Sequence, residues 1–90
     1  MIDSTFMSHY GFAIEEVWGR PRSYVRVDDS GDVWVVTDLD GLGLPSEGDS
    51  CLLWHYGSQE ERDTAMDIEP HLLRNVSEVI RAIREVRHNV

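Results

Sequence analysis

Closely spaced aspartates in the middle of the chain are the residues that most suggest chemistry. Asp38, Asp40 and Gly43 match the first, third and sixth positions of a calcium-binding loop, with Asp49 at the twelfth. Such a loop also needs an oxygen ligand at its fifth position, where this chain has Leu42, and a helix on either side. Because these requirements are not met, the pattern predicts no dedicated metal site, only the adventitious cation binding of an acidic loop.

The seven residues from Val35 to Gly41 form a hydrophobic run that ends in Asp-x-Asp-Gly. This segment resembles the first motif of the haloacid dehalogenase superfamily of phosphotransferases. The resemblance implies that Asp38 attacks phosphorus and that Asp40 acts as general acid and base. It also implies a large doubly wound domain, a later lysine and a downstream acidic pair for magnesium. The chain has no lysine and fifty residues after Asp40, so a phosphatase-like enzyme is kept only as an alternative.

The histidines and the single cysteine are the other candidates for catalysis or metal binding. The histidines are His9, His55, His71 and His88, and no metal-ligand spacing relates them. Cys51 lies in an apolar run, where its usual role is that of a small buried hydrophobe. Cys51 and His55 would share one face of a strand but lie about 13 Å apart, too far for a nucleophile and its base. We therefore predict a protein that is not an enzyme, with no catalytic residues, no cofactor and no metal.

Acidic charge is the most informative bulk property. The 90 residues include 17 acidic and 8 basic ones, for a formal net charge of −9 and a pI near 4.6. Such a balance disfavours direct binding to nucleic acid or to an anionic membrane. The charge is unevenly distributed along the chain. Residues 1–70 hold fifteen acidic side chains and four arginines, whereas residues 71–90 hold two acidic side chains and four arginines. The C-terminal segment is therefore locally basic.

Length and composition predict one domain that spans residues 1–90. No stretch approaches the ~20 apolar residues that a membrane-spanning helix needs. The first ten residues contain Asp3 and no lysine or arginine, so they lack the basic start of a signal peptide. We expect a cytoplasmic protein, in the cytoplasm of the host cell if a phage encodes it.

Two segments carry helix signals. Apolar residues recur every three or four positions near the C-terminus, and Pro70 suits a first helical turn, so residues 70–88 are predicted as an amphipathic helix. Ser58 followed by Glu61 has the spacing of a capping box. It predicts a short surface helix over about residues 59–66.

The middle of the chain has the character of β-strands. Residues 24–27 and 32–37 are rich in β-branched and aromatic side chains, and the turn residues 28–31 between them indicate a hairpin. Residues 51–56 are predicted as a buried central strand. Residues 12–18 fit either a strand or a short helix. The resulting fold class is α+β, a small antiparallel sheet of three or four strands with the C-terminal amphipathic helix packed on one face.

Aromatic side chains are numerous for so small a domain. They are Trp18, Trp34, Trp54, Tyr10, Tyr24 and Tyr56. Aromatic residues that do not join a core often stabilise protein interfaces. We expect at least half of these six to form the core and the remainder to be available for binding.

These features favour a small acidic protein that binds and inhibits or regulates a protein partner with a basic surface. The carboxylates would imitate the phosphates of nucleic acid, as in phage-type inhibitors such as anti-CRISPR proteins and other DNA mimics. The residues expected to bind the partner crowd the hairpin turn and the long loop of residues 39–50. They are Asp28, Asp29, Asp32, Asp38, Asp40, Glu47 and Asp49.

A second hypothesis also predicts a protein that binds a protein partner, but by a different kind of surface. An immunity-type or adaptor protein would recognise one enzyme through an aromatic and acidic patch. Such a protein need not compete with nucleic acid for its partner. The locally basic C-terminal helix could also meet the acidic remainder of a second copy, which would give a homodimer.

Overall fold

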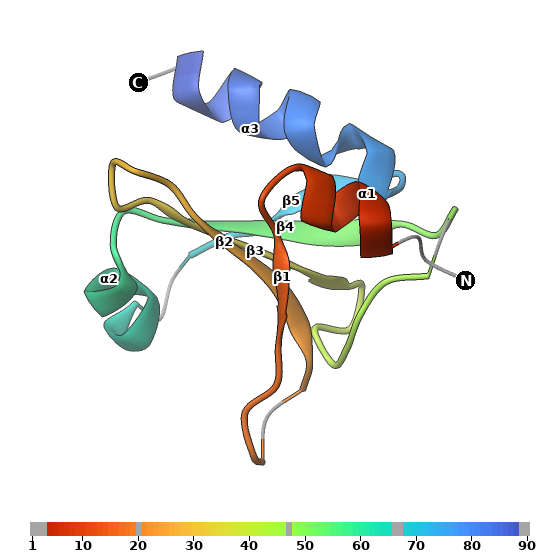
Figure 1. The fold of residues 1–90 in the computed structure, drawn as a ribbon, viewed down its shortest axis with the longest axis horizontal. Coiled ribbons are helices and arrows are strands. Elements are labelled where there is room, and N and C mark those ends of the chain that lie inside the picture. The colour runs from red at the N-terminus through yellow and green to blue at the C-terminus, as the bar shows by residue number, and fades with distance from the viewer. Residues whose placement is uncertain (1–3, 20, 47, 66–67, 89–90) are drawn as a thin grey trace.

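The computed structural model describes residues 4–19, 21–46, 48–65 and 68–88. Its centre is a five-stranded antiparallel sheet in which each strand pairs with the next along the chain (Figure 1). The strands are β1 (Ala13–Glu15), β2 (Ser23–Val27), β3 (Val33–Asp38), β4 (Cys51–Tyr56) and β5 (His71–Leu73). The α+β class is confirmed. The predicted three or four strands are too few, because β1 and β5 have three residues each and are too short to show an alternating pattern.

The predicted hairpin is formed by β2 and β3. Val25 pairs with Val35, and the amide of Gly31 donates a hydrogen bond of 2.9 Å to the carbonyl of Asp28 in the turn. Gly31 has a φ of +94°, a left-handed conformation that glycine adopts without steric cost. The turn residues of the sequence therefore located this hairpin correctly.

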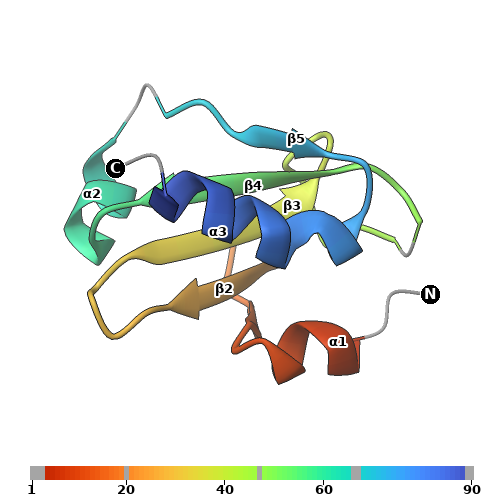
Figure 2. The ribbon, with the colours of Figure 1, turned by 90° about the horizontal axis from the view of Figure 1, so that it is seen from above.

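Helices cover one face of the sheet. α1 (Ser4–His9) and α3 (Val79–His88) both lie on this side (Figures 1 and 2). Their buried side chains join alternate residues of the strands in one hydrophobic cluster. The cluster comprises Met7, Phe12, Tyr24, Trp34, Val36, Cys51, Leu53, Leu73, Val76, Val79, Ala82 and Ile83. The C-terminal helix is present as predicted, whereas the sequence does not predict α1.

The helix predicted over residues 70–88 is wrong in its first half. β5 pairs with β4 there, a 3-10 turn (η1, Val76–Glu78) follows, and the α-helix begins only at Val79. Asn75 caps the turn by accepting a backbone hydrogen bond with its side chain. Leu72 fits the helical spacing but lies on β5 and is 70% exposed. The strand prevails because its backbone groups complete the open edge of β4.

α2 (Gln59–Thr64) is the predicted short surface helix, and none of its residues is buried. Ser58 Oγ accepts a hydrogen bond of 3.0 Å from the amide of Glu61. The Glu61 carboxylate in turn accepts one of 3.1 Å from the amide of Gly57. The first bond satisfies one of the donors that the start of a helix leaves unpaired, and the second ties the residue before the cap to the first turn. Among the helices of the described ranges, none is long and apolar enough to cross a bilayer.

The segment 12–18, whose conformation the sequence leaves open, contains a strand. β1 pairs with β2, with Ile14 opposite Tyr24. The loop that joins these two strands reaches away from the side that carries α1 and α3 (Figure 1). It therefore projects on the side of the sheet that those two helices do not cover.

Candidate binding surface

We call the face of the sheet opposite α1 and α3 the open face. Because side chains alternate along a strand, it carries Val35 and Thr37 of β3 and Trp54 and Tyr56 of β4. Val35 and Thr37 are buried, whereas Trp54 and Tyr56 are partly exposed. The open face thus presents aromatic and polar groups to solvent.

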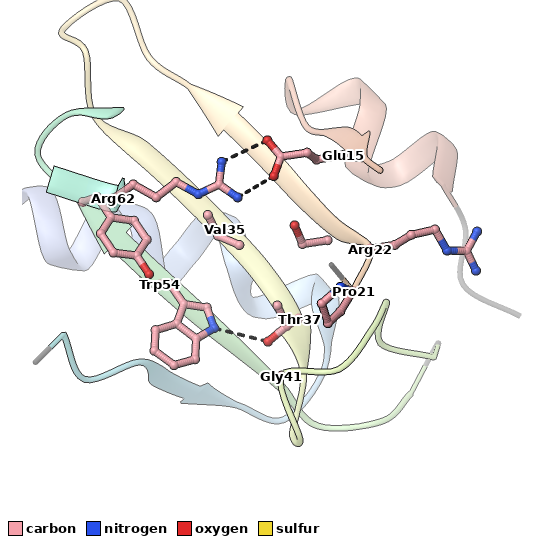
Figure 3. A pocket seen from close by; sticks show the side chains of 10 residues that line it. Glu15, Pro21, Arg22, Val35, Thr37, Gly41, Trp54 and Arg62 are labelled. Carbon is pink, nitrogen blue, oxygen red and sulfur yellow. Dashed lines mark hydrogen bonds and ion pairs between the residues drawn. The ribbon is translucent and has the colours of Figure 1, made fainter. Parts of the chain in front are cut away.

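A pocket of about 220 Å³ lies on the open face. Val35 and Thr37 of the central strand contribute to its lining (Figure 3). Trp54 and Arg62 line it on the side of β4 and α2, and Pro21 lines it on the side of β2. The pocket is therefore built by segments from both halves of the chain.

An ion pair closes one end of this pocket. Glu15 of β1 accepts hydrogen bonds of 2.6 and 3.0 Å from the two terminal nitrogens of the Arg62 guanidinium (Figure 3). The hydrogen bonds to Glu15 raise the pKa of Arg62, so the guanidinium stays charged. Paired, two-point contacts of this kind fix the orientation of both side chains. They hold α2 against the first strand across the open face.

The aromatic side of the pocket is also held in place by a hydrogen bond. Trp54 Nε1 donates to Thr37 Oγ1 at 3.2 Å, between side chains seventeen positions apart. Tyr56 adds a hydroxyl group to the lining, and burial raises the pKa of this phenol, an effect that the charge of Arg62 partly opposes. The phenol is therefore a neutral hydrogen-bonding group at physiological pH.

Trp18 is the most exposed large apolar side chain of the described residues. It lies in the loop between β1 and β2, where its side chain is 100% exposed and its neighbour Val17 is 44% exposed. Two of the six tryptophans and tyrosines, Tyr24 and Trp34, lie in the core cluster, fewer than the predicted half. Aromatic groups are therefore more available on the surface than the sequence indicates.

The predicted partner-binding aspartates of the hairpin turn have unequal surroundings. Asp28 accepts a hydrogen bond of 2.7 Å from Arg26 Nε and one of 2.8 Å from Trp34 Nε1, and its side chain is only 8% exposed. Asp32 accepts a hydrogen bond from Ser30 and lies 3.2 Å from His55 Nε2. Asp29 is exposed. Asp28 and Asp32 thus help to build the end of the sheet, and Asp29 is the most accessible of the three.

The predicted aspartates of the long loop also comprise one that shapes the backbone and others that are exposed to solvent. Asp38 Oδ1 accepts backbone hydrogen bonds of 3.1 Å from Asp40 and 3.0 Å from Leu42 and so shapes the loop. Asp40 and Asp49 are exposed, and both line a polar hollow of about 420 Å³ together with Asp38. Glu47 lies outside the described residues.

The six predicted carboxylates that the structure describes lie in two groups, at the hairpin turn and at the long loop. The first group consists of Asp28, Asp29 and Asp32, and the second of Asp38, Asp40 and Asp49. The first group adjoins the start of β3 and the second group adjoins its end, and the six residues of this strand span about 20 Å. Any partner that contacts both groups must have a basic surface of at least that length.

The phosphotransferase resemblance is not accompanied by the fold that it implies. The described sheet is antiparallel throughout, whereas a doubly wound domain has a parallel sheet. Asp38 does end a central strand, but its carboxylate is engaged by the backbone of its own loop. Within the described ranges, no group of three or more histidine, cysteine or acidic side chains is arranged to hold a metal ion.

Cys51 is a buried core residue, as the sequence predicts. Its side chain is 0% exposed on the helix-covered face of β4. Burial, assisted by the charge of Glu78, raises the pKa of this thiol to about 11. The thiol therefore stays protonated at neutral pH and is a poor nucleophile.

Comparison with known protein families, curated proteins and solved structures finds no match for this chain. The site is therefore defined by its own geometry. Sequence reasoning missed Glu15 and Arg62, which lie 47 positions apart and carry no common motif. It also did not single out Trp18, although an apolar pair beside Gly19 and Pro21 is unusual in a turn and could have marked it.

Proposed function

We propose that this chain is a small acidic binding module that inhibits or regulates a protein partner by contact, without catalysis. Its contact face consists of the open-face pocket, Trp54, Tyr56 and the projecting Trp18. The observation that carries the proposal is the full exposure of Trp18 in a loop whose residue Pro21 lines the pocket. Isolated domains seldom leave an indole in water, and tryptophan is enriched among the residues that dominate binding energy.

The shape of the contact face supports binding of a protein surface. The β1–β2 loop reaches away from the side that carries α1 and α3 (Figure 1), and its residue Pro21 lines the pocket. A partner can therefore surround the Trp18 indole while it also covers the open face. The Glu15–Arg62 pair fixes α2 against this face. Binding to a preorganised face loses little conformational entropy, which favours affinity.

The acidic charge defines the electrostatic character of the partner. A net charge of −9 speeds association with a basic protein and slows approach to acidic ones. Asp29, Asp40 and Asp49 are exposed at the two ends of β3 and are available for long-range attraction. We therefore expect a partner with an apolar pocket for Trp18 that lies within a basic surface.

Nucleic-acid mimicry is a second candidate, favoured by the two carboxylate groups about 20 Å apart. In this mode, typical of phage-encoded inhibitors such as anti-CRISPR proteins, the carboxylates would occupy the phosphate sites of a nucleic-acid enzyme. Competition with DNA or RNA for the partner, weakened steeply by salt, would distinguish mimicry from recognition through the aromatic contact face.

The test is affinity capture from the native host with the tagged chain and with Trp18→Ala. Tyr10→Ala is the control, because it removes a partly exposed aromatic side chain that follows α1 directly, on the side of the sheet that the helices cover. We expect one basic protein to be retained by the wild type and by Tyr10→Ala, and its binding to Trp18→Ala to be weaker by at least about tenfold. Equal retention by all three proteins would refute the aromatic contact face.

A further inference from the structure

We propose that the open-face pocket receives one uncharged aromatic side chain of the partner, such as a phenylalanine. This inference rests on the proposed function, because it assigns the group that the contact face takes from the partner. Three observations carry it: the volume of the pocket, the pairing of its charged residues and the chemistry of its walls.

The volume limits the guest to one ring. The pocket measures about 220 Å³, below the 300 Å³ or so at which sites for drug-sized ligands begin. A cavity of roughly 150 Å³ already holds benzene. The pocket therefore accommodates one phenyl ring with its methylene group.

The charges of the lining exclude a charged guest. Glu15 is paired with Arg62, and Arg22 lies 3.7 Å from Glu16. Each charged residue that lines the pocket therefore already has an oppositely charged partner. A lysine, arginine or carboxylate that entered would lose its water without gaining an ion pair, which is unfavourable.

The walls suit an aromatic ring. The indole of Trp54 is oriented by its hydrogen bond to Thr37, so its ring is available for offset or edge contacts with a second ring. Val35 supplies an apolar surface (Figure 3). Ser23 and Tyr56 contribute hydroxyl groups that can bond to the polar backbone on either side of the inserted residue.

The experiment titrates the chain with N-acetyl-phenylalaninamide and observes the three indole N–H signals by NMR. Trp54 reports the pocket, Trp34 reports the buried face and Trp18 reports the exposed loop, so two of the signals are internal controls. We expect a saturable shift of the Trp54 signal, with Trp18 and Trp34 little changed. N-acetyl-argininamide and the α-amide of N-acetyl-aspartic acid, which keeps its side-chain carboxylate, should bind at least about tenfold more weakly.

A second arm fills the pocket. Val35→Phe enlarges a lining residue and should abolish the Trp54 shift, whereas Val27→Phe makes the same change at a 61% exposed position outside the lining and should not. An unchanged Trp34 signal verifies that the fold is kept. If Val35→Phe does not fold, the comparison of neutral and charged probes on the wild type still decides the matter.

The outcomes separate this inference from the proposed function. If no neutral aromatic probe gives a saturable Trp54 shift, or if the arginine probe binds as well, the pocket assignment is wrong. The contact face would still stand if Trp18→Ala releases the captured protein. If the probe binds but Trp18→Ala has no effect on capture, the pocket remains a site and the proposed contact face fails.

Discussion

The two faces of β3 and β4 are stabilised by different means. On the covered face, Trp34, Val36 and Leu53 are wholly buried beneath the helices, and apolar contact dominates. On the open face, Val35 and Thr37 are buried although neither α1 nor α3 covers them, within a surround that includes the Glu15–Arg62 pair. The open face therefore retains a pocket of about 220 Å³ beside the ion pair, whereas the covered face contributes its side chains to the hydrophobic core.

The largest expected difference between the faces comes from truncation of adjacent leucines on β4. Leu53→Ala removes a fully buried side chain and should lower the free energy of unfolding by about 2–5 kcal/mol. Leu52 lies on the open face and is only partly buried, so Leu52→Ala should lower the free energy of unfolding by clearly less. Urea unfolding of both variants measures the difference, and equal losses would show that the two faces contribute alike.

The next largest effect concerns the aspartates of the hairpin turn. Asp28→Ala leaves the Trp34 indole and the Arg26 guanidinium without their acceptor and should cost about 1–3 kcal/mol. Asp29→Ala, beside it but exposed, should leave stability nearly unchanged. Thermal unfolding of the two variants checks this, and an Asp28→Ala variant as stable as Asp29→Ala would show that the hydrogen bonds of Asp28 contribute little to the fold.

The raised pKa of Cys51 predicts that the protein becomes less stable at alkaline pH. Its folded-state pKa of about 11 lies above the unfolded value of 9.0, so the stability it contributes is complete below pH 9 and is lost as pH rises towards 11. From pH ~8 to pH ~9.5 this loss amounts to about 1 kcal/mol. In Cys51→Ala the free energy of unfolding should decline less steeply over the same pH range, as measured by urea unfolding. Parallel declines would mean that the thiol is accessible in the folded state.

The smallest effect is expected for the ion pair of the open face. A double-mutant cycle with Glu15→Gln and Arg62→Met should give a coupling energy of about 0.5 kcal/mol, because both groups remain partly in contact with water. Binding of the phenylalanine probe should nevertheless weaken in either single variant, since each removes the ion pair that closes one end of the pocket. A coupling energy near zero with unchanged probe binding would show that the Glu15–Arg62 pair does not help to form the pocket.

Local signals in the sequence predicted local structure well. The Asp-Asp-Ser-Gly turn, the capping box at Ser58 and the apolar run of β4 each depend on residues within a few positions of one another. The helix over residues 70–88 failed because Leu72 satisfies both a helical and a strand pattern. The backbone pairing of β5 with β4 decided between them, and no local pattern records that pairing.

The candidate site was far less predictable. The acidic residues could be assigned to the hairpin turn and to the long loop, but the distance between these two groups depends on the length of β3. Trp54 could be assigned to a strand, but the face that it occupies follows from the register with β3 and from the side on which α1 and α3 pack. Glu15 and Arg62 meet only because the turns of the chain bring β1 and α2 together.

By itself, the amino-acid sequence determined the acidic charge, the α+β class, the hairpin, the short capped helix and the burial of Cys51, since each arises from composition or from neighbouring residues. Only the tertiary structure decided the five-strand order, the shortened C-terminal helix, the pocket and the full exposure of Trp18. The physical reason is that alternation along a strand assigns two faces but does not say which of them the helices will cover.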